Sequence, residues 1–406
     1  MDQVVALPIA GESFLLFRDG KVILVDGGYN SGNLVEAIEK ASPGLQHIDI
    51  VVCTHSDQDH AGGLQNISRY FTGSIGEFWL PGIWSGIIRK LKSNPREVFE
   101  GLSEEINKVI DQLDLGVIWS EENIKPTLEA LAVEQRRHNV REERPEIAVE
   151  EIMHEPKSER FFDILNYSRR YGRWSCGLVK SSRREVCKAY ADCKVSIGLA
   201  KYWLDLIGSA VIIWSIAAQA EIYGSRIRLF DFEEFRSTRV ALGGEPGLLV
   251  PLNAVESKPQ IMDLTYLAQL SPVNQECLTF ISPPNPNGFG VIFCGDSPLG
   301  DGKEYSNSFL TTLPDPDVPY IVTAPHHGSE SNRIAYEHIY EHLKNVLWLR
   351  CGGTIKQPGP KFKSLDPTVR ACTHCPQLGI GRQSVVILLS RSAPFSRIYS
   401  RECKCV

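Results

Sequence analysis

The sequence lacks an uninterrupted apolar run of the length that spans a bilayer. Its most apolar stretch, 206–220, follows Asp205 and is closed by Glu221, whereas a transmembrane helix needs about 20 apolar residues. We interpret this stretch as a buried helix. The opening residues, MDQVVALPIAGESF, also lack the basic start and long apolar core of a signal peptide. We therefore expect a cytoplasmic protein without a membrane partner.

An excess of positive charge is also missing. Lys and Arg number 43 against 49 Asp and Glu, which gives a formal net charge of −6. This balance excludes a protein whose whole surface coats nucleic acid, although a local basic patch is compatible with it. The 11 cysteines, without an export signal, indicate thiols or metal ligands rather than a disulfide framework.

The 406 residues, 43% of them hydrophobic, can bury a sizeable core. Short apolar runs in the first 60 residues predict strands, and Asp19-Gly20 predicts a hairpin turn between two of them. Further strands are predicted at 226–230, 247–250, 278–281, 290–294, 320–323, 346–350 and 385–389. Residues 87–199 are instead rich in Glu, Arg and Lys and favour helices. We expect an α/β core formed by 1–86 and 200–406, interrupted by a mostly helical, charged insertion.

One segment of this insertion, 157–188, is strongly basic. It carries nine Lys or Arg against three acidic residues, a local balance of +6 that leaves −12 for the rest of the chain. Its aromatic residues are interleaved with the charges: Phe161, Phe162, Tyr167, Tyr171 and Trp174. Such a surface could contact phosphates and stack on bases. The alternative interpretation is a solvated helix face whose aromatic side chains enter the core.

A cluster of metal-ligand side chains follows the predicted strand 48–54. Residues 54–63 read Thr-His-Ser-Asp-Gln-Asp-His-Ala-Gly-Gly. On an extended loop His55 and Asp57 can point to one side, while Asp59 and His60 can turn to a second centre. This geometry suits two metal ions about 3.5–4 Å apart. Imidazole with carboxylate binds zinc, manganese or iron, and added carboxylate favours the harder Mn²⁺ or Mg²⁺.

Two later strands are predicted to end in the same kind of residue. The strand 290–294 leads into Gly295-Asp296, and the strand 320–323 leads into Pro-His-His-Gly-Ser at 325–329. Three separate strands thus deliver metal-binding groups at their carboxyl ends, where active sites are often found. The sequence predicts one centre that holds one or two divalent metal ions.

In this order, 54–63, Gly295-Asp296 and 325–329 resemble the motifs of the metallo-β-lactamase-fold superfamily, whose first motif is His-x-His-x-Asp-His. The closer resemblance is to the hydrolase domain of ComEC-type competence proteins and related phosphoesterases. Asp26, in Val-Asp-Gly-Gly, matches a strand-end aspartate of that family. The resemblance covers about 1–85 and 205–395 and implies an αββα sandwich, with the helical insertion outside it.

The resemblance also implies roles for single residues. The implied metal ligands are His55, Asp57, Asp59, His60, Asp296 and His327. The first two would hold one ion and the next two the other, with Asp296 bridging them and His327 completing the second site. Asp59 and His326 would be catalytic, with His326 beside the substrate as general acid or donor to a phosphoryl oxygen. Which of His326 and His327 is the ligand stays open, with His327 favoured. Asp26 would orient a ligand.

The sequence departs from the broader superfamily in one respect. Members with two full sites usually supply another histidine between the first motif and the bridging aspartate. Here the only histidines in that interval are His138 and His154, both in the insertion. The first metal site is therefore under-liganded, weakly occupied, or completed by water, by substrate or by one of these two residues.

These features predict a metal-dependent hydrolase, in particular a nuclease or phosphodiesterase that uses a metal-activated water. Nucleic acid or a nucleotide would be the substrate, approached by the basic segment 157–188. One alternative is a small-molecule ester, thioester or lactone hydrolase, because a fold does not fix a substrate. Another is a regulated effector subunit whose residues 87–199 bind a protein partner.

Weaker candidates lie nearer the C-terminus. Cys372, Cys375, Cys403 and Cys405 could form a four-thiolate zinc site that holds the tail, against the alternative of ordinary reduced thiols. Lys361 and Lys363 could contact phosphate or lie in a solvated loop. Ser329 could line the pocket, or it could cap the helix predicted at 333–344.

Overall fold

A computed structural model describes residues 2–113, 121–139, 174–192, 194–260, 264–271, 273–285, 288–312, 315–353, 357–375, 382–389, 397–398, 403 and 405. The chain forms two compact units. The first contains residues 1–81, 223–257 and 274–406, and the second contains 82–222 and 258–273. The predicted insertion, 87–199, falls inside the second unit, which is larger than the insertion at both ends.

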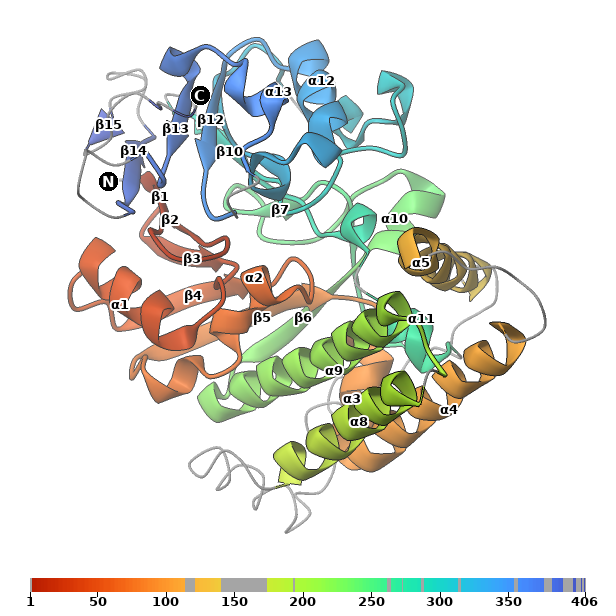
Figure 1. Ribbon diagram of the computed structural model, residues 1–406. Helices are drawn as coiled ribbons and strands as arrows, with labels where there is room; N and C mark the ends of the chain where they lie inside the picture. Colours follow the sequence, from red (N-terminus) through yellow and green to blue (C-terminus); the bar gives the residue numbers. More distant parts are fainter. Residues whose placement is uncertain are drawn as a thin grey trace. The chain divides into compact units, whose positions relative to one another are not determined.

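The first unit contains a nine-stranded mixed sheet (Figure 1). Its strands are β1 (Gln3–Ala6), β2 (Phe14–Arg18), β3 (Lys21–Val25), β4 (His47–Val52), β5 (Ser74–Pro81), β6 (Arg226–Asp231), β8 (Val255–Ser257), β14 (Val385–Leu388) and β15 (Arg397–Ile398). Their order across the sheet is β15-β14-β1-β2-β3-β4-β5-β6-β8. The neighbours from β3 to β6 pair in parallel, so β3 and β4 end at the same edge.

The β2–β3 hairpin has the predicted two-residue turn. Asp19 and Gly20 both adopt left-handed backbone angles, with φ of 51° and 75°. This conformation matches the twist of the flanking strands, and Asp and Gly tolerate it better than most residues. Arg18 pairs with Lys21 directly across the turn, which fixes the register of the two strands.

The second sheet of this unit has six strands in the order β13-β12-β11-β10-β9-β7. They are β7 (Val250–Pro251), β9 (Phe280–Ser282), β10 (Gly290–Phe293), β11 (Tyr320–Thr323), β12 (Val346–Arg350) and β13 (Arg370–Cys372). The strands from β10 to β13 are parallel. Their carboxyl ends therefore also meet at one edge.

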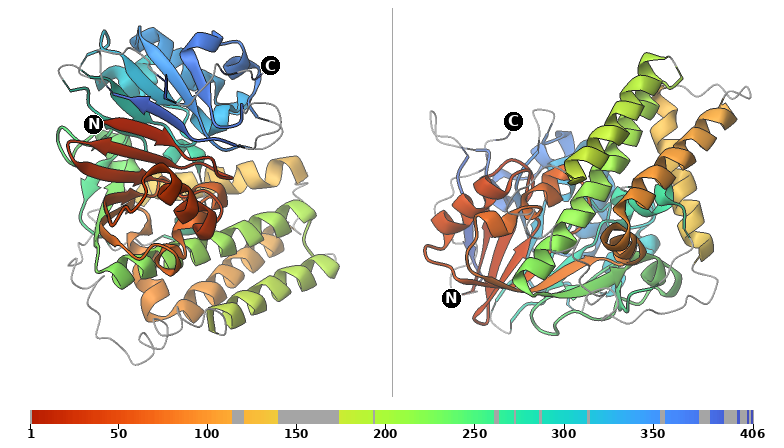
Figure 2. Two further views of the ribbon diagram at one scale, coloured as in Figure 1. Left: turned by 90° about the vertical axis from the view of Figure 1, so that its left-hand side faces the viewer. Right: turned by 90° about the horizontal axis from the view of Figure 1, so that it is seen from below.

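One hydrophobic core joins the two sheets, which Figure 2 shows as separate layers. It combines side chains of the first sheet, such as Phe14 and Trp79, with side chains of the second, such as Phe293 and Leu349. On its other face the second sheet packs against α12 (Arg333–His342) and α13 (Pro360–Lys363). Successive side chains of a strand point to opposite faces of the sheet. The second sheet therefore contacts the first sheet on one face and helices on the other, which gives a layered unit.

Shorter helices complete the first unit. They are α1 (Ser31–Ala41), α2 (Gln58–Ala61) and α10 (Phe232–Thr238). Helix α1 begins after Asn30, whose side chain accepts hydrogen bonds from the N–H groups of Gly32 and Asn33. This capping satisfies N–H groups that lack a partner within the helix. Short 3-10 turns occur at 62–64, 67–69, 274–276, 305–307, 309–312, 325–328, 330–332 and 367–369.

The described part of the second unit is helical. It contains α3 (Trp84–Ser93), α4 (Pro95–Leu113), α5 (Glu121–Asn139), α8 (Trp174–Ala191), α9 (Ile197–Tyr223) and α11 (Tyr266–Leu270). The long helices α4, α8 and α9 run alongside one another (Figures 1 and 2). The short α11 is held at both ends, because Glu105 accepts from its first N–H groups and Arg136 donates to the carbonyl of Ala268. These charges complement the helix dipole.

The helix α9 is longer than the buried helix predicted at 206–220. Among the described residues it is the one helix that by length and composition could cross a membrane, and 61% of its most apolar window is buried inside the protein. A core helix of a globular unit passes the same test. This helix therefore favours neither a membrane nor a soluble location.

The mixed α/β architecture expected from the sequence is confirmed. The predicted strands at 226–230, 290–294, 320–323 and 346–350 correspond to β6, β10, β11 and β12. The strand β5 was not predicted, because Gly76 and Glu77 interrupt its apolar pattern. It is nevertheless central, pairing with both β4 and β6.

Candidate metal centre

The three predicted motifs meet at the carboxyl ends of parallel strands in the first unit. Residues 53–60 follow β4, Gly295-Asp296 follows β10, and the histidine pair follows β11. Asp26 directly follows β3, which is parallel to β4. Because β10 and β11 are also parallel, chain segments far apart in sequence reach one place.

His60 is held by Asp26 in the interior. Its Nδ1 donates to Oδ2 of Asp26 over 2.7 Å, and both side chains are fully buried. The other ring nitrogen, Nε2, lies 3.0 Å from Oδ1 of Asp296. Because Nδ1 is bonded to Asp26, Nε2 is the nitrogen that faces the centre and is available to a metal ion.

His55 is oriented by a relay that also ends on Asp26. The hydroxyl of Thr54 donates to Oδ2 of Asp26 over 2.8 Å, so its oxygen accepts from Nδ1 of His55, 3.0 Å away. The backbone N–H of Thr54 donates to the other oxygen of Asp26. Nε2 of His55 is left facing Asp57 and Asp296, with carboxylate oxygens at 3.7 and 3.8 Å.

Asp296 lies between the two histidines of the first motif. Its Oδ1 faces His60 and its Oδ2 faces His55, and the side chain is 3% exposed. Two amides hold the residue, because Asn274 donates to Oδ2 and Asn332 donates to the backbone carbonyl. A carboxylate in this position can reach two neighbouring ions.

His327 is buried and faces Asp59. Its Nε2 lies 2.9 Å from Oδ2 of Asp59, and its Nδ1 donates to the carbonyl of Cys351 over 3.1 Å. Glu12 lies 3.4 Å from the same Nδ1 and is equally buried. The guanidinium of Arg350 donates to the backbone carbonyl of His327 over 2.8 Å. The ring is therefore fixed from both sides.

His326 takes a different position. Its side chain is 28% exposed, and its Nε2 lies 3.5 Å from Oδ2 of Asp296. The hydroxyl of Ser331 lies 3.3 Å from its Nδ1. His326 is thus at the solvent side of the centre, within reach of both solvent and the buried carboxylate.

The backbone is strained at this centre. Asp26, His326 and His327 adopt left-handed angles, with φ of 56°, 48° and 54°. Residues with a Cβ rarely adopt this conformation, and it costs about 1–3 kcal/mol each where it persists. The strain turns both histidines in succession out of the strand direction, which separates the buried ring from the exposed one.

Charges of opposite sign reinforce one another in the centre. Burial alone would raise the pKa of Asp296, but the positive charge of His60 beside it holds that pKa well below its usual range. The pKa of Asp59 is also low, because the hydrogen bond from His327 outweighs the effect of burial. Burial opposes charge on His327, whereas its hydrogen bond to Asp59 and the nearby carboxylate of Glu12 raise its pKa to about 9.

Two glycines of the first motif are required by close backbone approach. A Cβ on Gly63 would overlap the carbonyl of Gly27, and a Cβ on Gly62 would lie against the carbonyl of Tyr29. The hydrogen bond from Gly63 N–H to the carbonyl of Gly28 closes this contact. The tight packing places the 26–28 turn next to His60.

The donor atoms fit a divalent metal ion. Nε2 of His55, Nε2 of His60 and Oδ1 of Asp296 are buried without a hydrogen-bond partner, as is one oxygen of Glu12. Ligand atoms of His55, His60 and Asp296 lie within 4.8 Å of one another, and so do those of Glu12, His60 and His327. Buried polar atoms without partners are costly, and a bound cation would satisfy them.

Other predicted residues lie outside this group. His138 is on α5 in the second unit, 70% exposed and beside Glu134, and His154 lies outside the described residues. Ser329 caps the turn 330–332 through its hydroxyl. The lysines Lys361 and Lys363 are on α13, whose preceding Gly359 donates to the carbonyl of Gly328 in the histidine loop.

The basic segment 157–188 is described only from 174 onward, where it forms part of α8. Lys180, Arg183, Arg184 and Lys188 are exposed on this helix. Residues 157–173, including Phe161, Phe162, Tyr167 and Tyr171, lie outside the described residues, and so does the side chain of Trp174.

Sequence reasoning missed several residues that support the centre. Glu12 precedes β2 and is buried at 1% exposure, and Cys277 places its sulfur 3.4 Å from Nδ1 of His55. The thiol of Cys277 also accepts from the N–H of Asp296. Glu12 follows a glycine in a turn, where an acidic residue is ordinarily exposed, so the local sequence carries no signal of its burial.

One comparison with known proteins found a family match. Residues 7–103 match the family model of the metallo-beta-lactamase superfamily. The match includes Glu12, Asp26 and the first motif, and it ends before Asp296 and the histidine pair. No curated protein matches the chain. Members of this superfamily are mostly hydrolases and bind divalent metals, typically zinc, which with the candidate metal groups suggests a metal-dependent hydrolase.

Proposed function

We propose that this protein is a metal-dependent phosphodiesterase or nuclease. The carboxylate-rich donor set of the candidate centre is the observation that carries this proposal. Asp57, Asp59 and Asp296 accompany buried imidazoles, and oxygen donors favour the harder ions, Mn²⁺ or Mg²⁺, beside zinc. Such ions stabilise the charge on the oxygens of a phosphodiester in an in-line displacement.

The geometry supports two metal positions that share Asp296. His55 and Asp57 would hold one ion near Oδ2 of Asp296, and His60 with Asp59 and His327 would hold the other near Oδ1. His326 faces Oδ2 of Asp296. It can therefore supply the further ligand of the first site, for which the only histidines between the first motif and Asp296 lie in the insertion. Bound there, the metal would activate water for attack and polarise a phosphoryl oxygen.

As the alternative to ligating the first ion, His326 is placed to move a proton. It is the most exposed imidazole of the centre, and its Nε2 lies 3.5 Å from Oδ2 of Asp296. A protonated imidazole at the solvent side can donate to a phosphoryl or leaving oxygen. Asp59 lies on the same side, with its Oδ2 2.9 Å from Nε2 of His327, and would help to hold the second ion.

Two surface features would bind a nucleotide or nucleic acid. Tyr29 is 45% exposed, and its backbone carbonyl accepts from the side chain of Gln58 on α2, the helix that carries Asp59 and His60. An exposed ring there can stack on a base. The exposed basic residues of α8 would contribute phosphate attraction.

We further propose the finer architecture that the resemblance implies. The first unit would be an αββα sandwich of the ComEC-type hydrolase group, and residues 87–199 a helical insertion that could also bind a protein partner. A cytoplasmic location remains part of this proposal. The shared core of the two sheets supports the sandwich.

The test is turnover by the purified full chain. The protein is incubated with Mn²⁺ or Zn²⁺ and with labelled single- and double-stranded DNA, RNA and cyclic nucleotides. Ester, thioester and lactone substrates are tested in parallel. We expect metal-dependent cleavage of a phosphodiester that Asp296→Asn abolishes. His326→Ala should lower kcat by about 10²–10⁴, whereas His138→Ala, on an exposed histidine of the second unit, should leave it unchanged.

The substrate class has its own controls. Tyr29→Ala should raise KM for a nucleotide substrate, and Tyr29→Phe should not. Cleavage of esters alone would replace the proposal with the small-molecule hydrolase. Phosphodiester turnover that survives in Asp296→Asn would show a contaminating enzyme and overturn it.

A further inference from the structure

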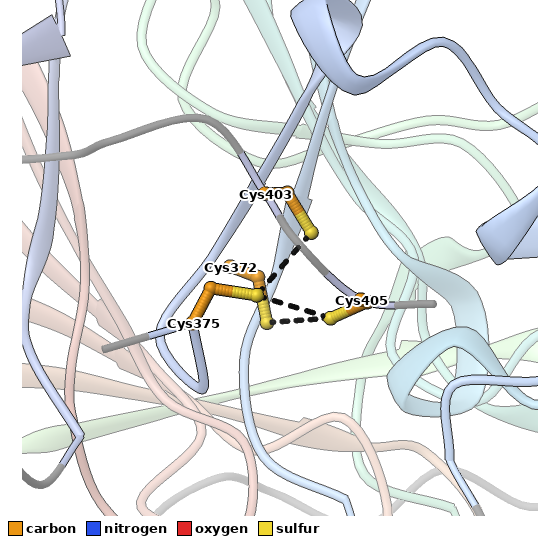
Figure 3. A group of neighbouring side chains, drawn as sticks. All are labelled: Cys372, Cys375, Cys403 and Cys405. Carbon is orange, nitrogen blue, oxygen red and sulfur yellow. Dashed lines mark hydrogen bonds between the residues drawn. The ribbon is translucent and has the colours of Figure 1, made fainter. Parts of the chain in front are cut away.

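Four cysteines converge at the end of the second sheet, away from the histidine and aspartate ligands in sequence. Cys372 ends β13 and Cys375 follows three residues later, while Cys403 and Cys405 come from the C-terminal segment. Cys372 and Cys403 are buried, at 7% and 1% exposure. Figure 3 shows all four side chains directed toward one point.

The separations between the sulfurs match a metal site. Cys375 lies 3.2 Å from Cys405 and 3.5 Å from Cys403, and Cys405 lies 3.8 Å from Cys372. Four sulfurs placed tetrahedrally at the Zn–S bond length of about 2.3 Å are about 3.8 Å apart. A covalent disulfide would require about 2.05 Å. All four sulfurs lie within 4.8 Å of one another, as one ion requires.

Hydrogen-bond donors surround Cys372 as they would a thiolate. Its Sγ accepts from Nη1 of Arg350 over 3.1 Å and from the backbone N–H of His374 over 3.3 Å. Donors of this kind stabilise metal-bound sulfur and orient it. Arg350 is 1% exposed, and its Nη2 is buried without a hydrogen-bond partner. A buried guanidinium without a counter-charge is unfavourable.

We propose that Cys372, Cys375, Cys403 and Cys405 bind one structural zinc ion, whose tetrathiolate charge balances Arg350. Four thiolates fill a tetrahedral shell and leave no open position, so this site would not be catalytic. Thiolates also select zinc over the harder ions that suit the carboxylate-rich centre. The ion would hold Cys403 and Cys405 at the end of β13.

This site would also support the candidate metal centre. Arg350 bonds the cysteine cluster through Nη1 and the carbonyl of His327 through Nε. The C-terminal segment would therefore stabilise the strained histidine turn through one buried side chain. The zinc proposal is independent of the reaction catalysed, since absence of phosphodiester cleavage would leave it unchanged.

The experiment measures metal content and ligand type. The full chain, purified under reducing conditions, should contain zinc that is retained in Asp296→Asn and lost by one equivalent in Cys375→Ser. Cys187→Ser is the matched control, because Cys187 is exposed on α8 and outside the cluster. Protein reconstituted with Co²⁺ should show the intense thiolate-to-cobalt charge-transfer absorption of a four-sulfur tetrahedral site.

A second measurement on the unaltered chain covers the case in which Cys375→Ser does not fold. Thiol titration of the native protein should find these four cysteines protected and then released by a chelator. Disulfide-linked cysteines, bound iron in place of zinc, or a cobalt spectrum without thiolate bands would each overturn the proposal.

Discussion

Nδ1 of His60 donates a hydrogen bond to Asp26 over 2.7 Å, with both side chains fully buried. The same carboxylate accepts from the hydroxyl of Thr54, which in turn accepts from Nδ1 of His55. One aspartate therefore sets the tautomer of two histidines and leaves both Nε2 atoms free to bind a metal. In the proposed metal centre Asp26 would act as a positioning residue.

We expect Asp26→Asn to weaken Mn²⁺ binding about 10–100-fold, because an amide can present its N–H₂ group to the imidazoles and disturb their tautomers. Thr54→Val should reduce the Mn²⁺ affinity of only one of the two proposed positions, since it removes the hydroxyl that connects Asp26 to His55 and leaves the bond to His60 intact. Isothermal titration measures both constants. Asp49→Asn is the control, since Asp49 bonds Lys21 and Val22 outside the centre. Equal affinities in Asp26→Asn and Asp49→Asn would contradict this role.

Binding of Mn²⁺ should raise the melting temperature of the protein. An ion that binds only the folded state stabilises it by about 2.7 kcal/mol at a concentration of 100 times Kd. Thermal unfolding with increasing Mn²⁺ should show a shift that vanishes in Asp296→Asn. Because the cysteine cluster prefers softer ions, Cys375→Ser should keep the Mn²⁺ shift. Its loss there would mean that the two sites are not separate.

Arg228 on β6 joins three carboxylates within the first unit. Its guanidinium bonds Glu77, Glu245 and Glu256, and it is 6% exposed. Arg228→Met should lower the free energy of unfolding by about 3–5 kcal/mol, because it leaves partly buried carboxylates without their counter-charge. Denaturant unfolding measures the loss. A loss below 1 kcal/mol, as for exposed pairs, would contradict this account.

The same cluster predicts that the stability of the fold depends on pH. Burial opposes ionisation of Glu256, but its hydrogen bonds from Arg228 lower its pKa below the usual value. Its contribution is therefore fully present above the unfolded pKa of about 4.3 and is lost as the pH falls through the lower folded value. Glu256→Gln should be less stable than the unaltered protein at pH 6, and the difference should shrink toward pH 3. A difference independent of pH would exclude this explanation.

Gly63→Ala should destabilise the fold by about 1–3 kcal/mol, since its Cβ would overlap the carbonyl of Gly27. Gly208→Ala in α9 is the matched control, because a Cβ there meets nothing within 4 Å. That control should stabilise the helix by up to about 1 kcal/mol. Unfolding curves in urea distinguish the two, and equal effects would show that backbone approach at Gly63 is not limiting.

Arg350→Met should affect both candidate metal sites. The substitution removes the donors to Cys372 and to the carbonyl of His327 while keeping an apolar side chain of similar length. We expect faster release of zinc to a chelator and weaker Mn²⁺ binding. Arg226→Met, on the exposed end of β6, serves as control. Unchanged zinc release would separate Arg350 from the cysteine cluster.

Much of the candidate site could be proposed from the sequence because its residues lie close together in short segments. Residues 55–60, Asp296 and the histidine pair each follow a short apolar run, and in the structure each of these runs forms a strand that ends just before them. The Asp19-Gly20 turn was predictable for a similar reason, since its backbone angles are a property of two adjacent residues. By contrast, β5 contains Gly76 and Glu77 and gave no clear pattern.

The partners of these residues depended on the tertiary structure. Glu12 reaches His327, and Cys372 reaches Cys405, across stretches of chain that carry no mutual signal. Such contacts follow from strand order and from the packing of two sheets on one core. By itself the sequence determined which strand ends carry the candidate ligand side chains. Only the fold decided which imidazole is buried, which is exposed, and that Asp26 holds two of them, because these depend on burial and on side chains meeting in space.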